Sequence, residues 1–231
     1  MPTDQASPLI ELERVDEFGE PPWQAGQEWA NAITHGIAAI ATLVLGYFLV
    51  LRAQQESTGM AIACAAYIAS VFGTFFFSTL SHLVKPSPLL NVLRSWDQAM
   101  IYAMISGTYT PIVYRFATDG TRTWLLWAIW IAAGAGFFHK VAMKHRVNSS
   151  GTISYLLLGW LPAIPLFGQV PSVVVTWMFI GGIFYTLGVV LLVNDRKVRY
   201  LHAGWHLMVM TAAFSHYWTI FNHVAPATLT P

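Results

Sequence analysis

Charge is scarce in this chain of 231 residues. Only 10% of the residues are Asp, Glu, Lys or Arg, whereas 55% are hydrophobic. Soluble domains usually carry about a quarter of their residues as charged ones. The net charge of +1 and the pI of about 7.9 say nothing about nucleic acid, and we expect no nucleic-acid partner. The composition excludes an ordinary soluble protein and indicates a membrane protein.

Cysteine pairs and a cleavable leader are also missing. The chain has one cysteine, Cys64, so no intramolecular disulfide can form. The first 27 residues hold six of the eleven acids and lack the basic start and short apolar run of a signal peptide. We therefore expect residues 1–27 to be a flexible acidic tail and residues 28–225 to form one transmembrane domain.

Long apolar stretches dominate the rest of the chain. A helix that crosses the roughly 30 Å hydrocarbon core needs about 20 apolar residues. Continuous rather than alternating hydrophobicity disfavours a β-barrel. The sequence predicts an all-α bundle of seven transmembrane helices, over about 31–51, 59–83, 98–116, 124–143, 151–167, 172–193 and 203–223.

The Lys and Arg residues predict the orientation of these spans. If the N-terminus is cytoplasmic, the inner segments hold nine basic residues: Arg14, Lys85, Arg94, Lys140, Lys144, Arg146, Arg196, Lys197 and Arg199. The outer segments then hold only Arg52, Arg115 and Arg122. Positive charge concentrates on the cytoplasmic side of membrane proteins. We expect a multi-pass protein of a bacterial inner membrane, with its N-terminus inside and its C-terminus outside.

Four metal-binding side chains fall at the cytoplasmic ends of three predicted spans. His82 ends the second span, Asp97 begins the third, and His202 and His206 lie in the first two turns of the seventh. The last two are four residues apart, on one face of a helix. An ionisable group at membrane depth needs a partner, a watery cavity or a metal. The four residues therefore predict a shared site at one depth.

Zinc suits such a set of ligands. Three protein ligands plus a water are the arrangement of a catalytic zinc site. The metal lowers the pKa of this water towards about 7, which makes hydroxide available near neutral pH. Asp97 is placed to orient the water and carry its proton. Ser78 lies one turn before His82, where its hydroxyl is placed to support the water or a substrate carbonyl.

Simpler interpretations of these residues stay open at this level. A single histidine near a membrane interface is often a packed or interfacial polar residue. Asp97 is also a candidate cap for the start of the third helix, or a partner for Arg94 three residues earlier. Glu28, Asn31 and His35 form one stripe of the first helix, either as groups that hold the ligating imidazoles or as a polar helix start at the headgroups.

Several motifs carry a family resemblance. The stretch Glu28-Trp-Ala-Asn31-Ala-Ile-Thr34-His35-Gly36-Ile resembles the signature that opens the first span of bacterial haemolysin III proteins. Ser78-x-x-x-His82, Asp97 with Pro111, and His202-x-x-x-His206 followed by Ala212–Tyr217 resemble the progestin and adipoQ receptor family, which includes haemolysin III and the adiponectin receptors. The resemblance runs from about Glu28 to His223.

The resemblance implies a role for each matched residue. His82, His202 and His206 match the three zinc ligands, Asp97 the acid that hydrogen-bonds the metal-bound water, and Ser78 the serine before the first ligand. The family fold is a seven-helix bundle with a cytoplasmic N-terminus. Adiponectin receptors are associated with ceramide hydrolysis, and some bacterial members with membrane-lipid homeostasis. The short tail does not match the receptors' cytoplasmic domain, so hormone binding is not carried over.

The function we expect is hydrolysis of an amide or ester bond in a membrane lipid, with zinc as cofactor. One alternative is a membrane sensor or regulator in which the metal only stabilises the bundle. Another is a cytolytic protein, although seven apolar spans argue against a secreted soluble toxin. A retinal pump needs a lysine within the last span, and residues 203–223 contain none.

Overall fold

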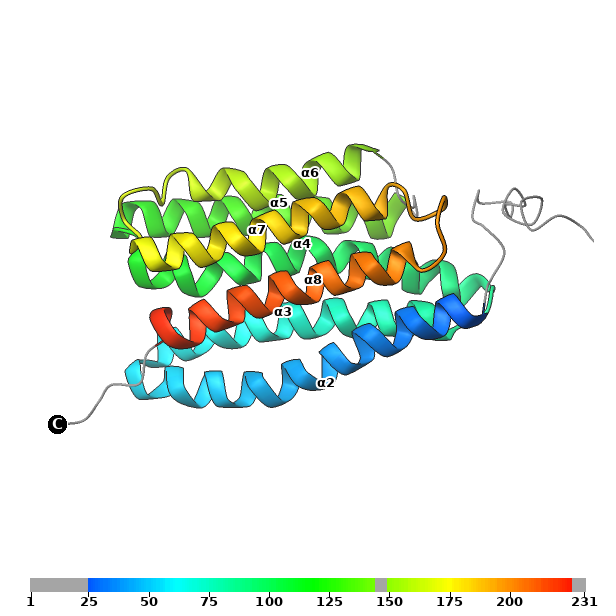
Figure 1. The fold of residues 1–231 in the computed structure, drawn as a ribbon. Coiled ribbons are helices and arrows are strands. Elements are labelled where there is room, and N and C mark those ends of the chain that lie inside the picture. Colours follow the sequence, from blue (N-terminus) through cyan, green and yellow to red (C-terminus); the bar gives the residue numbers. More distant parts are fainter. Residues whose placement is uncertain (1–24, 144–148, 226–231) are drawn as a thin grey trace, which may run out of the picture.

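Residues 25–143 and 149–225 are described by a computed structural model, and within them the fold is entirely helical. Seven α-helices lie side by side and reverse direction at each connection (Figure 1). Their bounds are α2 Ala25–Glu56, α3 Thr58–Leu83, α4 Pro88–Phe116, α5 Asp119–Met143, α6 Ser149–Trp160, α7 Ser172–Leu192 and α8 Leu201–Thr219. Helix α2 includes residues 25–27, which we had placed in the tail, and residues 1–24 lie outside the described residues.

Serine caps explain where two helices begin. The Ser57 hydroxyl accepts a hydrogen bond from the backbone N–H of Met60 and starts α3. The Ser87 hydroxyl caps α4 in the same way through Leu90 N–H, and Pro88 follows at the first helical position. Helix α4 therefore begins ten residues before the predicted start at 98. This placement corrects the interpretation of Asp97 as a helix cap, because Asp97 lies nearly three turns inside the helix.

The fifth predicted span, 151–167, is only partly helical. Helix α6 ends at Trp160, and a short 3₁₀ turn follows over Leu161–Ala163. Pro162 and Pro165 have no backbone N–H, so an α-helix cannot continue through them without losing hydrogen bonds. The α-helical part of the last predicted span, α8, ends at Thr219, and a π-helical turn follows over Ile220–Val224.

Each helix is held by its neighbours in a closed arrangement. Helix α2 packs against α3 and α8, α3 against α4, α4 against α5, and α7 against α8, while α6 contacts α4, α5 and α7. The beginnings of α2, α4, α6 and α8 share one end of the bundle with the ends of α3, α5 and α7 (Figure 1). We call this the amino-terminal end.

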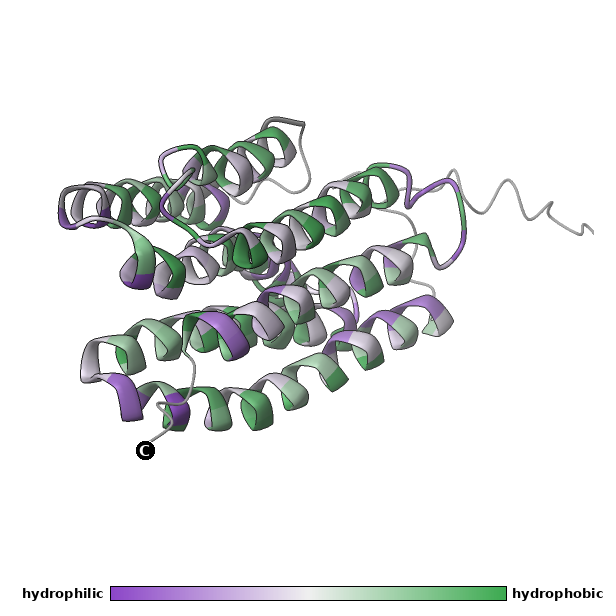
Figure 2. Cartoon of the chain, turned by 60° about the vertical axis from the view of Figure 1, so that its left-hand side comes forward, coloured by the Kyte–Doolittle hydropathy of each residue, from purple (hydrophilic) through white to green (hydrophobic). Residues whose placement is uncertain are grey.

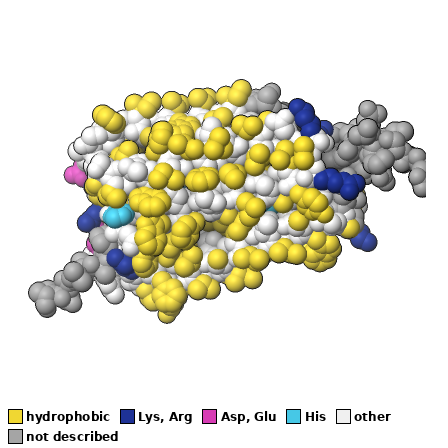
Figure 3. Space-filling view, viewed as in Figure 1, with side chains coloured by type: hydrophobic (Ala, Val, Ile, Leu, Met, Phe, Trp, Pro, Cys, Tyr) yellow, Lys and Arg dark blue, Asp and Glu magenta, His cyan; other side chains and the backbone are white. Residues whose placement is uncertain are grey.

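The outside of the bundle is apolar between its two ends. Hydrophobic residues alternate with weakly polar ones along all the helices (Figure 2). In Figure 3, hydrophobic side chains cover the flank, while Lys and Arg side chains gather at the two ends. Large side chains such as Ile40, Trp127 and Phe138 are 67%, 67% and 72% exposed. An apolar surface of this extent on a single chain fits contact with lipid rather than water.

Four helices are long and apolar enough to cross a membrane by length and composition: α2, α3, α5 and α7. The other three carry more polar side chains or, in α6, fewer residues. Helices α4 and α8 contain the predicted site residues Asp97, His202 and His206.

Candidate metal centre

Three histidines from two helices meet at the amino-terminal end of the bundle. His82 lies in the last turn of α3, and His202 and His206 lie in the first two turns of α8. One ligand nitrogen from each lies within 4.8 Å of the others. Nitrogen ligands of one tetrahedral zinc ion are about 3.4 Å apart, so small ring rotations are enough for joint ligation. The three predicted ligands thus form a cluster that could hold a metal ion.

Two of these imidazoles are oriented by carboxylates. The Nδ1 atom of His82 lies 2.6 Å from Glu28 Oε2, and the Nδ1 atom of His202 lies 2.8 Å from Asp195 Oδ2. A carboxylate accepts hydrogen bonds, so each Nδ1 carries the proton and donates it. The lone pair of each ring is then on Nε2, the atom left for a metal.

The third imidazole is oriented by helix α2 itself. His206 Nδ1 lies 3.2 Å from the backbone oxygen of Asn31 and 3.1 Å from Thr34 Oγ1. The Thr34 hydroxyl donates its own proton to backbone oxygens of α2, so its oxygen accepts a hydrogen bond from His206 Nδ1–H. All three rings therefore have the same tautomer, with Nε2 unprotonated.

The burial of these rings supports the fit to a metal ion. The Nε2 atom of His82 is buried and has no hydrogen-bond partner among the described residues. His206 is 1% exposed and His82 is 8% exposed. A buried lone pair without a donor is unfavourable, and a cation bound by the three rings would satisfy it.

A carboxylate and a hydroxyl lie beside the cluster. Asp97 Oδ2 accepts a hydrogen bond from Ser81 Oγ at 3.1 Å, and Ser81 directly precedes His82. Ser78 is 1% exposed, and its hydroxyl is 2.7 Å from His35 Nδ1. The side chains of Asp97 and Ser78 both line one cavity with His202 and His206.

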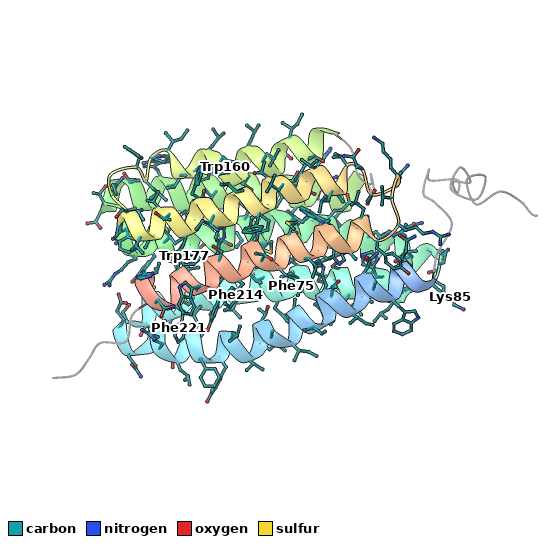
Figure 4. The ribbon with its side chains drawn as sticks, viewed as in Figure 1. Phe75, Lys85, Trp160, Trp177, Phe214 and Phe221 are labelled. Atoms are coloured by element: carbon teal, nitrogen blue, oxygen red, sulfur yellow. The ribbon has the colours of Figure 1, made fainter. Side chains whose placement is uncertain are left out.

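The three polar residues predicted on α2 contact the site in different ways. Glu28 bonds His82 directly, whereas Asn31 reaches His206 only through its backbone oxygen. His35 bonds no predicted ligand; its ring stacks on that of His206, with centroids 3.5 Å apart and planes 8° from parallel. The His35 ring also lies with its centroid 4.9 Å from that of Phe75, which Figure 4 places in the middle of the bundle.

Sequence reasoning missed two contacts with the site. Thr34 lies between Asn31 and His35 on α2, and its hydroxyl contributes to holding His206. Asp195 lies in the turn between α7 and α8, seven residues before His202. Asp195 lies two residues after the predicted sixth span, 172–193, and close in sequence to His202. That placement was the available signal, because an acid so near a predicted ligand is a candidate partner for it.

The cavity extends from the cluster into the apolar interior. Its volume is about 270 Å³. The cluster and Asp97 lie at the amino-terminal end, while Leu166, Phe167 and Val170 line it after the end of α6. Most of the wall between these parts is aliphatic or aromatic. The cavity thus has a polar end with a possible metal site and a long apolar part.

Comparison with known proteins identifies the family. Residues 23–217 match the family described as Haemolysin-III related. The chain belongs to the haemolysin III family. This assignment confirms the resemblance that the motifs on the predicted first, second, third and seventh spans indicated. The family and the apolar helices together identify a membrane protein.

Relatives of this haemolysin III family member occur in bacteria and mammals. Hemolysin-3 of Bacillus cereus is 31% identical over 205 residues, which cover 87% of this chain and 93% of that protein. The Hemolysin-3 homolog of Bacillus subtilis (strain 168) is 29% identical over 188 residues, covering 80% and 88%. The monocyte to macrophage differentiation factor of Homo sapiens is 28% identical over 200 residues, covering 84% and 83%.

Proposed function

We propose that this haemolysin III family member is a zinc-dependent hydrolase that cleaves an amide or ester bond in a membrane lipid. The observation that carries this proposal is the three-histidine cluster at the polar end of an otherwise apolar cavity. Nitrogen ligands from three imidazoles favour zinc over magnesium or calcium. Zinc, when bound, supplies Lewis acidity and makes water nucleophilic near neutral pH.

The protein side chains supply the remaining parts of a hydrolytic site. Asp97 is the only acid that lines the cavity among the described residues, so its carboxylate is placed to take a proton and pass it to the leaving amine or alcohol. The Ser78 hydroxyl is oriented by His35, and it is placed to hydrogen-bond the substrate carbonyl. The apolar part of the cavity would bind an acyl chain and exclude water.

We also propose that all seven helices span the inner membrane of a bacterium, with the amino-terminal end of the bundle in the cytoplasm. The helices α4, α6 and α8 pack beside the four apolar helices, and this packing supports seven spans. The excess of Lys and Arg in the connections at that end supports the orientation. A reporter that is active only outside the cytoplasm should be active when it is fused after residue 225. Activity at that position of a reporter that works only in the cytoplasm would contradict this topology.

The hydrolase proposal is tested by metal analysis and lipid turnover. Protein purified in detergent should hold about one zinc per chain and should hydrolyse members of a library of acyl amides and esters. Asp97→Asn should keep the zinc and lose about 100-fold or more of the turnover, the scale of general acid–base catalysis. Asp119→Asn is the matched control, because Asp119 lies at the other end of the bundle with its side chain 96% exposed.

Failure of the unmutated, zinc-loaded protein to turn over any lipid would contradict the hydrolase. A sensor or regulator would then be supported if Asp97→Asn is also silent in cells and loss of His206 unfolds the protein. The relatives named Hemolysin-3 raise a cytolytic function as a further outcome. Lysis of red cells that survives alanine at His82 and His206 would favour a cytolytic function independent of the metal.

A further inference from the structure

A buried lysine faces the same cavity as the metal cluster. Lys140 lies in the last turn of α5, at the amino-terminal end of the bundle, and is 3% exposed. Its side chain lines the cavity together with Asp97 and Gln98. Among the described residues that line this cavity, Lys140 is the only Lys or Arg.

The surroundings of Lys140 are built to hold it in this position. Its Nζ atom donates a hydrogen bond to Gln98 Oε1 at 3.1 Å and lies 6.0 Å from the centre of the Tyr155 ring. The Tyr155 hydroxyl in turn donates to the backbone oxygen of Gln98 at 2.9 Å. The Tyr102 ring packs on Tyr155 with centroids 4.6 Å apart. Helices α4, α5 and α6 thus fix one ammonium group at the cavity wall.

The inward direction of Lys140 is the informative feature. A lysine near the end of a membrane helix normally extends its side chain to the interface and keeps its charge in water. Burying an ammonium group is costly unless charged or polar groups surround it. A cation that faces the cavity is complementary to a ligand that brings a negative charge.

We propose that Lys140 and Gln98 bind an anionic group, phosphate or carboxylate, in the head of the lipid substrate, a few bonds from the linkage that is cleaved. This inference rests on the proposed hydrolase function and specifies its substrate class. The acyl chain fits only the apolar part of the cavity, so the head group stays at the amino-terminal end. There His202 and His206 of α8 and Lys140 of α5 line the same cavity.

The inference is tested with pairs of substrates that differ in charge but share the cleaved bond. N-palmitoylglycine and N-palmitoylethanolamine share a fatty amide, and ceramide 1-phosphate and ceramide form a second pair. The native protein should prefer the anionic member by about 10- to 100-fold in kcat/KM, the range expected for a hydrogen bond to a charged group. Lys140→Met should reduce this ratio to about threefold or less, and Lys140→Arg should restore most of it.

A binding measurement separates this inference from the hydrolase proposal. The Asp97→Asn protein should bind N-palmitoylglycine at least about tenfold more tightly than N-palmitoylethanolamine. The double variant Asp97→Asn, Lys140→Met should bind the two lipids with equal affinity. Lys197→Met is the matched control, since Lys197 is exposed in the turn between α7 and α8 at the same end of the bundle. If Lys140→Met does not fold, Gln98→Leu and Lys140→Arg test the same subsite.

The outcomes are distinct for the two proposals. Hydrolysis without any charge preference would overturn the anionic subsite and leave the hydrolase standing. Binding that depends on Lys140, without hydrolysis of any lipid, would support the subsite and overturn the hydrolase. Competition by inorganic phosphate as strong as that by the anionic lipid would show that Lys140 serves a soluble anion, which contradicts the lipid assignment.

Discussion

The hydrogen bond between Glu28 and His82 allows a quantitative prediction about metal binding. Glu28→Gln keeps the size of the side chain but replaces the carboxylate that accepts the Nδ1 proton at 2.6 Å. Loss of such a partner typically weakens metal affinity 10- to 100-fold. That range corresponds to about 1.4 to 2.8 kcal/mol of binding free energy.

The exposure of the two carboxylate–histidine pairs predicts where each falls in this range. The side chains of His82 and Glu28 are 8% and 15% exposed, whereas those of His202 and Asp195 are 28% and 24% exposed. A hydrogen bond shielded from water contributes more than one that water can replace. We therefore expect Glu28→Gln to weaken zinc binding by nearly 100-fold and Asp195→Asn by about tenfold.

The assay is competition for zinc between the purified protein and a fluorescent chelator of known affinity. Glu56→Gln is the control, because Glu56 lies at the opposite end of α2 and pairs with Arg115. It removes a carboxylate from the same helix at a distance of about 42 Å along the axis. Equal zinc affinity in the native protein and Glu28→Gln would refute the reasoning, as would an equal loss in Glu56→Gln.

Two further predictions concern the stability of the bundle. Gly136→Ala should destabilise the protein by about 1–3 kcal/mol in thermal or denaturant unfolding, because a Cβ atom there would lie 2.4 Å from the Tyr102 ring. Gly134→Ala on the same helix meets nothing within 4 Å and should change stability by no more than about 1 kcal/mol; equal effects at the two positions would contradict the packing. Zinc at about 1,000 times its Kd should stabilise the native protein by about 4 kcal/mol. A chelator should therefore lower the Tm of the native protein, and it should lower the Tm of the His206→Ala variant much less.

Much of the candidate metal centre followed from the order of residues along the chain. The spacing of His202 and His206 places both rings on one helix face whatever surrounds them. The alternation of span direction then requires His82 and the start of α8 to reach the same end of any antiparallel bundle. Scarcity of charge determined that the surface would be apolar, because too few polar side chains are present to cover it.

Helix boundaries depended on local contacts that the hydropathy pattern did not reveal. The apolar residues before Asp97 are interrupted by Asn91 and Arg94, which hid the first turns of α4. Only the Ser87 cap and Pro88 mark its true start. The premature end of α6 was hidden in the opposite way, because apolar residues continue through Pro162 although the α-helix ends at Trp160.

The pairing of His82 and of His206 with their acceptors on α2 was decided only by the tertiary structure. Glu28 and His82 are 54 residues apart, and Asn31 and His206 are 175 residues apart. For His82 and His206, the acceptor that each ring meets depends on the rotation of α2 about its axis, which is set by packing against α3 and α8. The inward direction of the Lys140 side chain was likewise decided by the tertiary structure. Composition and periodicity determine that a lysine ends α5, but whether its side chain turns to lipid, water or the cavity depends on the helices beside it.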